Sequence, residues 1–325
     1  MNSNAAVVDV RRLVEEADAR IRPWVLETPV EHSGYLSELI GGEVYLKLDL
    51  QQTTGSFKFR GATSKVMSLT EEQLDIGVVT ASTGNYALAV GQAMKNRGRR
   101  ATVYVAETMV PARVEQIESH GIDIVKYGSD PWDAERKARA DAAENGLMYV
   151  SPYNDPEVVG GQGTCGLEIA RQVRDLDTVI AACGGGGLIG GTAGFLKSVN
   201  PAVETIAISP QNSPVLYESV RQGKMIEMES EETLADTCAG GIDLDTITFD
   251  LCRNYVDEMA VATEDEIADA IRLLFKHHRL VTEGSAALSI AYIVENAERL
   301  RGRRVVAVVC GKNVDMNLFK QIVCC

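Results

Sequence analysis

Lys58 lies in the segment Thr54–Ala62, TGSFKFRGA, between two phenylalanines and at the start of a predicted helix. An amine set among apolar residues loses hydration, which lowers its pKa and suits it to forming a Schiff base with a carbonyl compound. Taken alone, the residue type favours a solvated lysine on a helix surface, because most lysines lie in water. Lys58 is therefore a candidate nucleophile that needs support from other segments.

A run of glycines follows the predicted apolar strand Thr178–Cys183 and precedes a helix; the segment Cys183–Gly191 reads CGGGGLIGG. Adjacent glycines allow backbone N–H groups to converge on one point, and the N-terminus of a helix adds about half a positive charge. Four adjacent glycines are hard to explain as a turn alone. The segment therefore predicts a phosphate-binding loop.

The residues in and after this loop indicate the kind of phosphate. Gly185, Gly187 and Gly190 match the dinucleotide pattern G-x-G-x-x-G, but a single match is weak evidence. A dinucleotide site also needs an acidic residue at the end of the next strand to bind the ribose, and here that strand ends at Ser209. No Gly-Lys-Ser/Thr closes the loop as in a P-loop. A single terminal phosphate group fits better.

Two further strand ends carry residues that could bind a ligand. Ala81–Tyr86, ASTGNY, offers hydroxyls and the first amides of a helix to a small carboxylate, although it is equally typical of an ordinary helix cap. Cys310 follows the strand Val305–Val309 and begins CGKN. A thiol there faces the crevice where α/β proteins bind ligands, although packing is the commoner role of a buried cysteine.

Short β-branched runs alternate with amphipathic stretches, which predicts an α/β fold with mostly parallel open sheets. Thr263 and Glu266 form a capping box, and Gly98, Gly121 and Gly146 each follow a helix end. Residues 76–151 are predicted to form four strands alternating with three helices, as a small domain inserted into a large one of residues 1–75 and 152–325. A cleft between two such units commonly binds a cofactor. The predicted strands are Val44–Leu48, Val78–Ala81, Ala101–Ala106, Asp123–Tyr127, Met148–Ser151, Thr178–Cys183, Glu204–Ser209, Glu258–Thr263 and Arg303–Cys310.

Composition excludes several classes of protein. The 325 residues carry a net charge of −14 without a basic stripe, which argues against nucleic acid as a partner. Seven cysteines and four histidines show neither a disulfide framework nor a zinc-ligand spacing. No signal peptide and no apolar run long enough for a membrane span are present. We therefore expect a cytoplasmic protein with no membrane partner.

Taken together, these motifs resemble those of the fold type II pyridoxal-phosphate (PLP) enzymes, in the branch of threonine/serine dehydratases and serine racemases. The resemblance covers nearly the whole chain and includes Gly161–Thr164 (GQGT) and Glu283-Gly284 in addition to the segments above. It implies that Lys58 binds the cofactor as a Schiff base and that Phe57 packs beside its ring. It also implies that Asn85 contacts the ring hydroxyl and that Cys310 lies near the pyridine nitrogen. The remaining roles that it implies are phosphate binding by Gly184, Gly185, Gly186, Gly187 and Leu188, a place at the cofactor edge for Glu283, and substrate binding by Ser82, Thr83, Gly84, Asn85 and Tyr86.

The sequence departs from this branch at several positions. Tyr86 replaces the usual histidine, and CGKN at Cys310 replaces the usual S-G-G-N. Ser209 stands where metal-stimulated members carry an acidic residue, so we expect no metal site. We also expect no C-terminal regulatory domain after Cys325.

The expected reaction is β-elimination from a 3-hydroxy amino acid such as L-threonine or L-serine, giving a 2-keto acid and ammonia, with Lys58 and Thr83 as catalytic residues. Racemisation, β-replacement and a dehydratase for a bulkier or acidic 3-hydroxy amino acid remain alternatives. An NAD-binding protein is a more remote one. We expect a homodimer.

Overall fold

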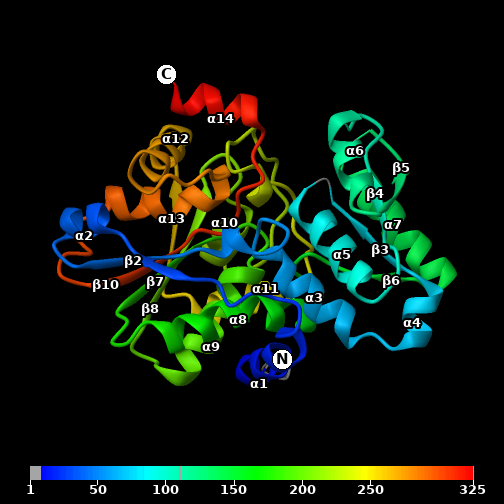
Figure 1. Cartoon of the computed structure of the whole chain (residues 1–325), viewed down its shortest axis with the longest axis horizontal. Coiled ribbons are helices and arrows are strands. Elements are labelled where there is room, and N and C mark those ends of the chain that lie inside the picture. Colours follow the sequence, from blue (N-terminus) through cyan, green and yellow to red (C-terminus); the bar gives the residue numbers. More distant parts are fainter. Residues whose placement is uncertain (1–8, 83, 110, 130, 325) are drawn as a thin grey trace.

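The computed structural model describes residues 9–82, 84–109, 111–129 and 131–324. These residues form two open sheets, each accompanied by helices (Figure 1). The strand order is β1-β2-β10-β7-β8-β9 in the six-stranded sheet and β5-β4-β3-β6 in the four-stranded sheet. All neighbouring strands run parallel except β1 and β2. The predicted α/β class with mostly parallel sheets is confirmed.

All nine predicted strands are present, and none of their ends differs by more than two residues from the prediction. The strand that the sequence did not predict is β1, which has three residues and is too short to show an alternating pattern. The strands are β1 (Val30–His32), β2 (Glu43–Lys47), β3 (Val78–Ala81), β4 (Thr102–Val105), β5 (Asp123–Lys126), β6 (Met148–Tyr149), β7 (Thr178–Ala182), β8 (Glu204–Pro210), β9 (Glu258–Ala262) and β10 (Arg304–Val308).

The helices begin and end largely where local chemistry predicts. Thr263 and Glu266 exchange the two hydrogen bonds of a capping box, and Gly98, Gly121 and Gly146 adopt positive φ angles after helix ends. The α-helices are α1 (Val10–Ile21), α2 (Gly34–Ile40), α3 (Lys58–Ser68), α4 (Glu71–Ile76), α5 (Asn85–Asn96), α6 (Pro111–Ser119), α7 (Pro131–Asn145), α8 (Pro156–Gln172), α9 (Gly187–Val199), α10 (Val215–Gln222), α11 (Ile247–Tyr255), α12 (Glu264–Leu273), α13 (Gly284–Glu295) and α14 (Met316–Val323). A π-helical turn, Leu274–His278, extends α12.

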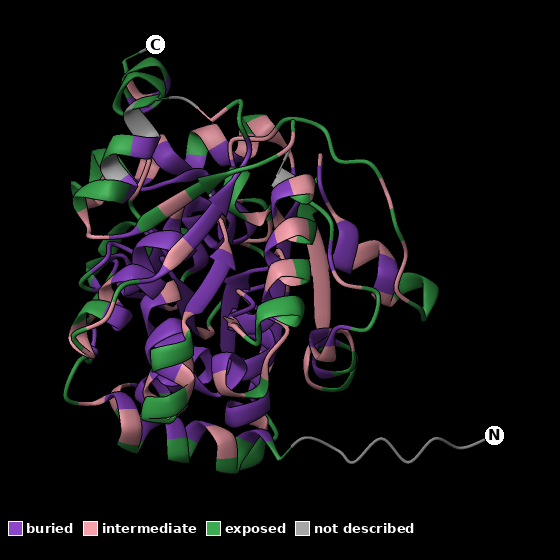
Figure 2. Ribbon diagram, turned by 90° about the vertical axis from the view of Figure 1, so that its right-hand side faces the viewer, coloured by how far each residue is buried: buried purple, intermediate pink, exposed green. Residues whose placement is uncertain are grey.

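The core lies around the six-stranded sheet, whose central strands are apolar on both faces because helices cover both (Figure 2). Helix α9 packs on one side of β7 and α13 on the other (Figure 1). The carboxyl ends of β7 and β10 lead into the glycine run and into Cys310, respectively. Since carboxyl ends of parallel strands meet at one edge, the fold brings these two segments together.

A buried ion cluster fixes helix α3, of which Lys58 is the first residue. The Arg60 guanidinium donates to Asp49 at 2.8 Å and to Glu168 at 2.6 Å, and Lys47 Nζ lies 2.6 Å from Glu168. All four side chains are fully buried. Burial acts to raise the pKa of Glu168, but Arg60 and Lys47 outweigh it and hold that pKa at about 2. The cluster joins η1 (Asp49–Gln51) and the strand β2 to α3 and α8.

Candidate active site

The amine of Lys58 faces two aromatic rings, lying 5.0 Å from the ring centre of Phe57 and 5.7 Å from that of Tyr86. Its Nζ donates to the Pro152 carbonyl at 3.4 Å. Loss of hydration lowers the pKa of Lys58, and the nearby Cys238, Cys310 and Glu283 oppose that shift only in part. An amine in this environment is readily deprotonated, as a nucleophile or general base requires.

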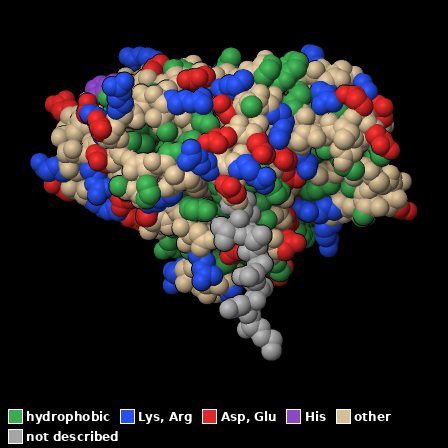
Figure 3. Space-filling view, turned by 90° about the horizontal axis from the view of Figure 1, so that it is seen from below, with side chains coloured by type: hydrophobic (Ala, Val, Ile, Leu, Met, Phe, Trp, Pro, Cys, Tyr) green, Lys and Arg blue, Asp and Glu red, His purple; other side chains and the backbone are tan. Residues whose placement is uncertain are grey.

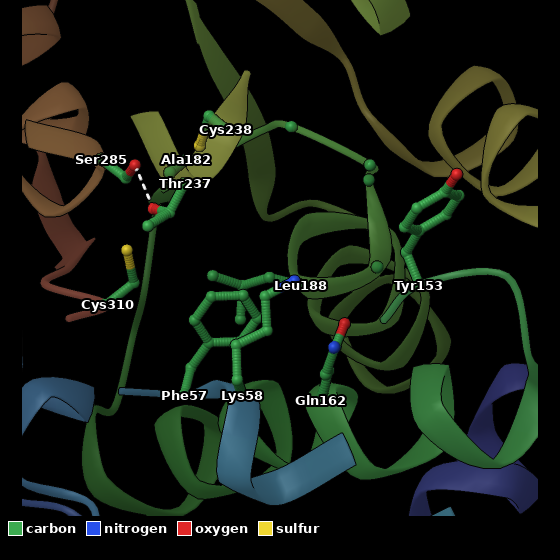
Figure 4. Close-up of a pocket in the computed structure, with 14 residues that line it drawn as sticks. Phe57, Lys58, Tyr153, Gln162, Ala182, Leu188, Thr237, Cys238, Ser285 and Cys310 are labelled. Carbon is green, nitrogen blue, oxygen red and sulfur yellow. Dashed lines mark hydrogen bonds between the residues drawn. The ribbon is translucent and has the colours of Figure 1, made fainter. Parts of the chain in front are cut away.

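The four adjacent glycines line a cavity together with Lys58, Leu188 and Cys310; we call it the glycine cavity (Figure 4). A Cβ at Gly185 would lie 2.6 Å from the Tyr153 ring, and one at Gly187 would lie 2.2 Å from Gln162 Oε1. Gly186 has φ of +79°, which other residues rarely adopt. Helix α9 begins at Gly187, so its N-terminus opens at this cavity. The loop thus fits a phosphate group.

Cys310 and Phe57 are held together by the backbone, since the Phe57 N–H donates to the Cys310 carbonyl at 2.9 Å. Both side chains line the glycine cavity. Burial raises the pKa of the Cys310 thiol well above its ordinary value. The thiol is therefore neutral at physiological pH.

Asn85 and Glu283 are hydrogen-bonded to each other at the edge of a second cavity, although they are far apart in the sequence. Asn85 Nδ2 donates to both carboxylate oxygens of Glu283, at 2.8 and 3.0 Å, while Asn85 Oδ1 accepts from Asn313 at 2.7 Å. The Asn313 backbone N–H donates to Glu283 at 3.1 Å. Burial raises the pKa of Glu283, and these hydrogen bonds limit the rise.

Ser82, Gly84, Asn85 and Tyr86 line this second cavity of about 250 Å³, which we call the outer cavity. Lys58 and Gly185 border both cavities. Thr83, predicted as a catalytic residue, lies outside the described residues. The Tyr86 hydroxyl donates to the Ser151 carbonyl at 2.6 Å, so its proton is already engaged, and burial raises its pKa well above the ordinary value.

Sequence reasoning assigned no role to several residues that line the glycine cavity. Thr237 and Cys238 come from the long connection between α10 and α11, which has no periodic pattern. The Thr237 hydroxyl lies 2.5 Å from that of Ser285, as the dashed line in Figure 4 shows. Three other residues that line the glycine cavity lie in or next to recognisable sequence features. Gln162 is part of GQGT, Ser285 follows Glu283-Gly284, and Tyr153 is an aromatic residue just before α8.

The described residues contain no group of three or more His, Cys, Asp or Glu side chains placed to hold a metal ion. The hydroxyl of Ser209 donates to the Cys183 carbonyl at 2.7 Å. In the same part of the chain, no helix combines the length and apolarity needed to cross a bilayer.

A reactive lysine beside a glycine loop, at the carboxyl edge of an α/β sheet, defines a site for a cofactor that has both a carbonyl and a phosphate. Comparison with known proteins supports this interpretation of the site. Residues 21–311 match the family described as pyridoxal-phosphate dependent enzyme, and the chain belongs to this family. Its cofactor is pyridoxal phosphate, so the dinucleotide alternative is set aside.

The similar proteins share most of their length with this chain. It is 37% identical to the L-threonine ammonia-lyase of Thermotoga maritima over 310 residues, 95% of this chain and 77% of that protein. Threonine deaminase isoform 2 of Solanum lycopersicum superposes with a TM-score of 0.93 at 30% identity, covering 99% and 89% of the two chains. Maize serine racemase superposes with a TM-score of 0.90 at 31% identity, covering 96% and 95%. The predicted fold type II is therefore confirmed.

Proposed function

We propose that this protein is a hydroxy-amino-acid dehydratase that converts L-threonine or L-serine to a 2-keto acid and ammonia by β-elimination. The observation that carries the proposal is the position of the Lys58 amine, where the glycine cavity and the outer cavity meet. The similarity to threonine ammonia-lyase and threonine deaminase supports it.

The proposed roles follow from the contacts of each residue. The Gly184–Leu188 loop would hold the cofactor phosphate, and Phe57 would pack beside the ring. The cofactor when bound would supply an electron sink for the pair left on Cα. Lys58 would bind the cofactor through its amine. When the substrate amine takes its place on the cofactor, the freed Lys58 amine, with a lowered pKa, removes the Cα proton of the substrate.

The residues around Lys58 position the substrate and the ring. Ser82, Thr83, Gly84 and Asn85 receive the substrate carboxylate, and Tyr86 forms one wall of its site. Glu283 holds Asn85 in place through two hydrogen bonds. Cys310 would lie near the ring nitrogen of the cofactor, and its neutral thiol would leave that nitrogen largely unprotonated, which favours prompt loss of a β-leaving group.

Racemisation is the second candidate, because maize serine racemase has the same fold at 31% identity. It requires an acid on the face of the substrate opposite Lys58. We propose that Thr83 is that acid if racemisation occurs, but its β-branched side chain restricts χ1 and makes proton delivery to Cα slow. Elimination should therefore dominate.

The deciding experiment incubates the holoenzyme with L-serine and L-threonine and measures keto acid and D-amino acid side by side. We expect keto acid to form faster with both substrates. Faster formation of the D-enantiomer would reject the dehydratase assignment in favour of a racemase. Thr83→Ala should then abolish racemisation and retain some elimination.

We also propose the division into a large domain of residues 1–75 and 152–325 and a small domain of residues 76–151. The two separate sheets support it. A homodimer and a cytoplasmic location complete the proposal; sedimentation velocity of the purified enzyme tests the first and cell fractionation the second.

A further inference from the structure

One wall of the outer cavity carries acidic side chains, and we call it the acidic wall. It is formed by Tyr104 and Val105 of β4, Ala134 and Glu135 of α7, and the connection 236–242. Among the described residues that line this cavity, the acids are Glu135 and Asp236, and Lys58, which binds the cofactor, is the one base. A substrate side chain that extends past Lys58 therefore meets negative charge.

Glu135 is held by hydrogen bonds that all go, among those from described residues, to one of its two carboxylate oxygens. Its Oε1 accepts from Arg139 at 2.7 and 3.0 Å and from the Tyr149 hydroxyl at 3.0 Å. Its Oε2 accepts no hydrogen bond from the part of the chain that the structure describes. The carboxylate is thus oriented by one oxygen, while the other is available to a ligand.

Arg139 does not neutralise this wall. Its guanidinium also binds Asp243, at 2.8 and 3.0 Å, so the three charged side chains together carry one negative charge. Asp243 is in turn linked to the glycine run, since its backbone N–H donates to the hydroxyl of Tyr153, whose ring packs against Gly185. Asp243 is therefore connected to the phosphate loop through Tyr153.

We infer that the enzyme accepts 3-hydroxy amino acids whose side chain ends in a cationic amine, and that Glu135 selects for this group. The inference rests on the proposed dehydratase function. It excludes acidic 3-hydroxy amino acids, because a terminal carboxylate would face Glu135, and Lys58 is the one cation among the described residues that line the outer cavity.

The test compares binding of three five-carbon amino acids that lack the hydroxyl and cannot undergo elimination: L-ornithine, L-norvaline and L-glutamate. Each is titrated into the holoenzyme, and the change in cofactor absorbance gives Kd. We expect L-ornithine to bind about tenfold or more tighter than L-glutamate, with L-norvaline between them. Equal or tighter binding of L-glutamate would overturn the inference.

Two variants on α7 distinguish the effect of the Glu135 charge on binding from the effect of the net charge of the protein. Glu135→Gln keeps an acceptor for Arg139 and Tyr149 but removes the charge, and we expect it to lower the preference for L-ornithine over L-norvaline several-fold. Glu144→Gln makes the same charge change at an exposed position outside the cavity and should leave the preference unchanged. An unaltered preference in Glu135→Gln would also overturn the inference.

Ammonia release then distinguishes this inference from the proposed function. Ammonia is measured instead of keto acid, because a keto acid with a terminal amine cyclises to an internal imine. If the binding order holds but neither L-threonine nor 3-hydroxyornithine releases ammonia, the dehydratase proposal fails and the binding inference stands. If L-threonine releases ammonia but the binding order is absent, only the inference fails.

Discussion

Lys58 and the glycine run act through different physical effects, and single substitutions can separate them. Lys58 contributes a reactive amine whose pKa is lowered mainly by loss of hydration. The glycines contribute space and backbone amides, because a Cβ at Gly184, Gly185 or Gly187 would come within 3 Å of a neighbouring atom. The first effect bears on the reaction and the second on cofactor affinity.

We expect Lys58→Ala to lower turnover by at least about a thousandfold, because both the covalent link and the general base are lost. The characteristic visible absorbance of the lysine-bound cofactor should also disappear, while the far-UV circular dichroism should stay unchanged. Lys65→Ala on the same helix removes an ion pair with Asp155 and serves as the control. Appreciable activity in Lys58→Ala would contradict its proposed role.

We expect Gly185→Asp to raise the Kd for pyridoxal phosphate by about tenfold or more, equivalent to about 1.4 kcal/mol. The new side chain would collide with the Tyr153 ring and place a carboxylate near the phosphate. Fluorescence titration of the apoenzyme measures this. Gly34→Asp adds the same charge at a helix start where a Cβ meets nothing, so it should leave Kd unchanged.

At the scale of the elements, the sequence predicts most of the fold because buried parallel strands are apolar runs with clear ends. It does not predict the connection between α10 and α11, which carries Thr237 and Cys238. That segment has no period and is placed by tertiary contacts such as the one between Thr237 and Ser285. The motifs predict the candidate site. They do not predict the acidic wall of the outer cavity, because the sequence does not distinguish Glu135 from any other acidic residue on an amphipathic helix.

The ion cluster around Arg60 was also missed, since charged side chains are expected in water. Removing one partner of a buried ion pair leaves an uncompensated charge. Arg60→Met should therefore destabilise the protein by about 3–5 kcal/mol, as measured by urea unfolding. Arg11→Ala, which breaks an exposed pair with Glu15, should cost less than about 1 kcal/mol. Equal effects of the two substitutions would show that the cluster contributes no more than a surface pair.

At the scale of the whole molecule, surface charges of both signs are interspersed, as on the face shown in Figure 3. Exposed pairs of this kind contribute little to stability. The buried pairs contribute more, and their effect should dominate the response of the protein to acid.

The pKa of Glu168, at about 2, lies below the ordinary glutamate value of about 4.3. Its contribution to stability is therefore complete above the ordinary value and is lost as the pH falls towards 2. We expect the free energy of unfolding of the wild type to exceed that of Glu168→Gln by a margin that is constant between pH 6 and 8. Urea titrations should show the margin shrinking below about pH 5. A margin that does not depend on pH would contradict the assignment.

The place of β10 between β2 and β7 has a consequence for biosynthesis. Strand β2 (Glu43–Lys47) pairs with β10 (Arg304–Val308), which is synthesised much later. The Leu50 and Phe57 N–H groups likewise donate to the Val309 and Cys310 carbonyls. On the ribosome, the backbone N–H groups of Leu50 and Phe57 therefore lack these acceptors until residues 309–310 have been synthesised. We therefore expect the cofactor to bind only after residues 304–310 have been synthesised, and the apolar strands made earlier to be exposed to aggregation until then.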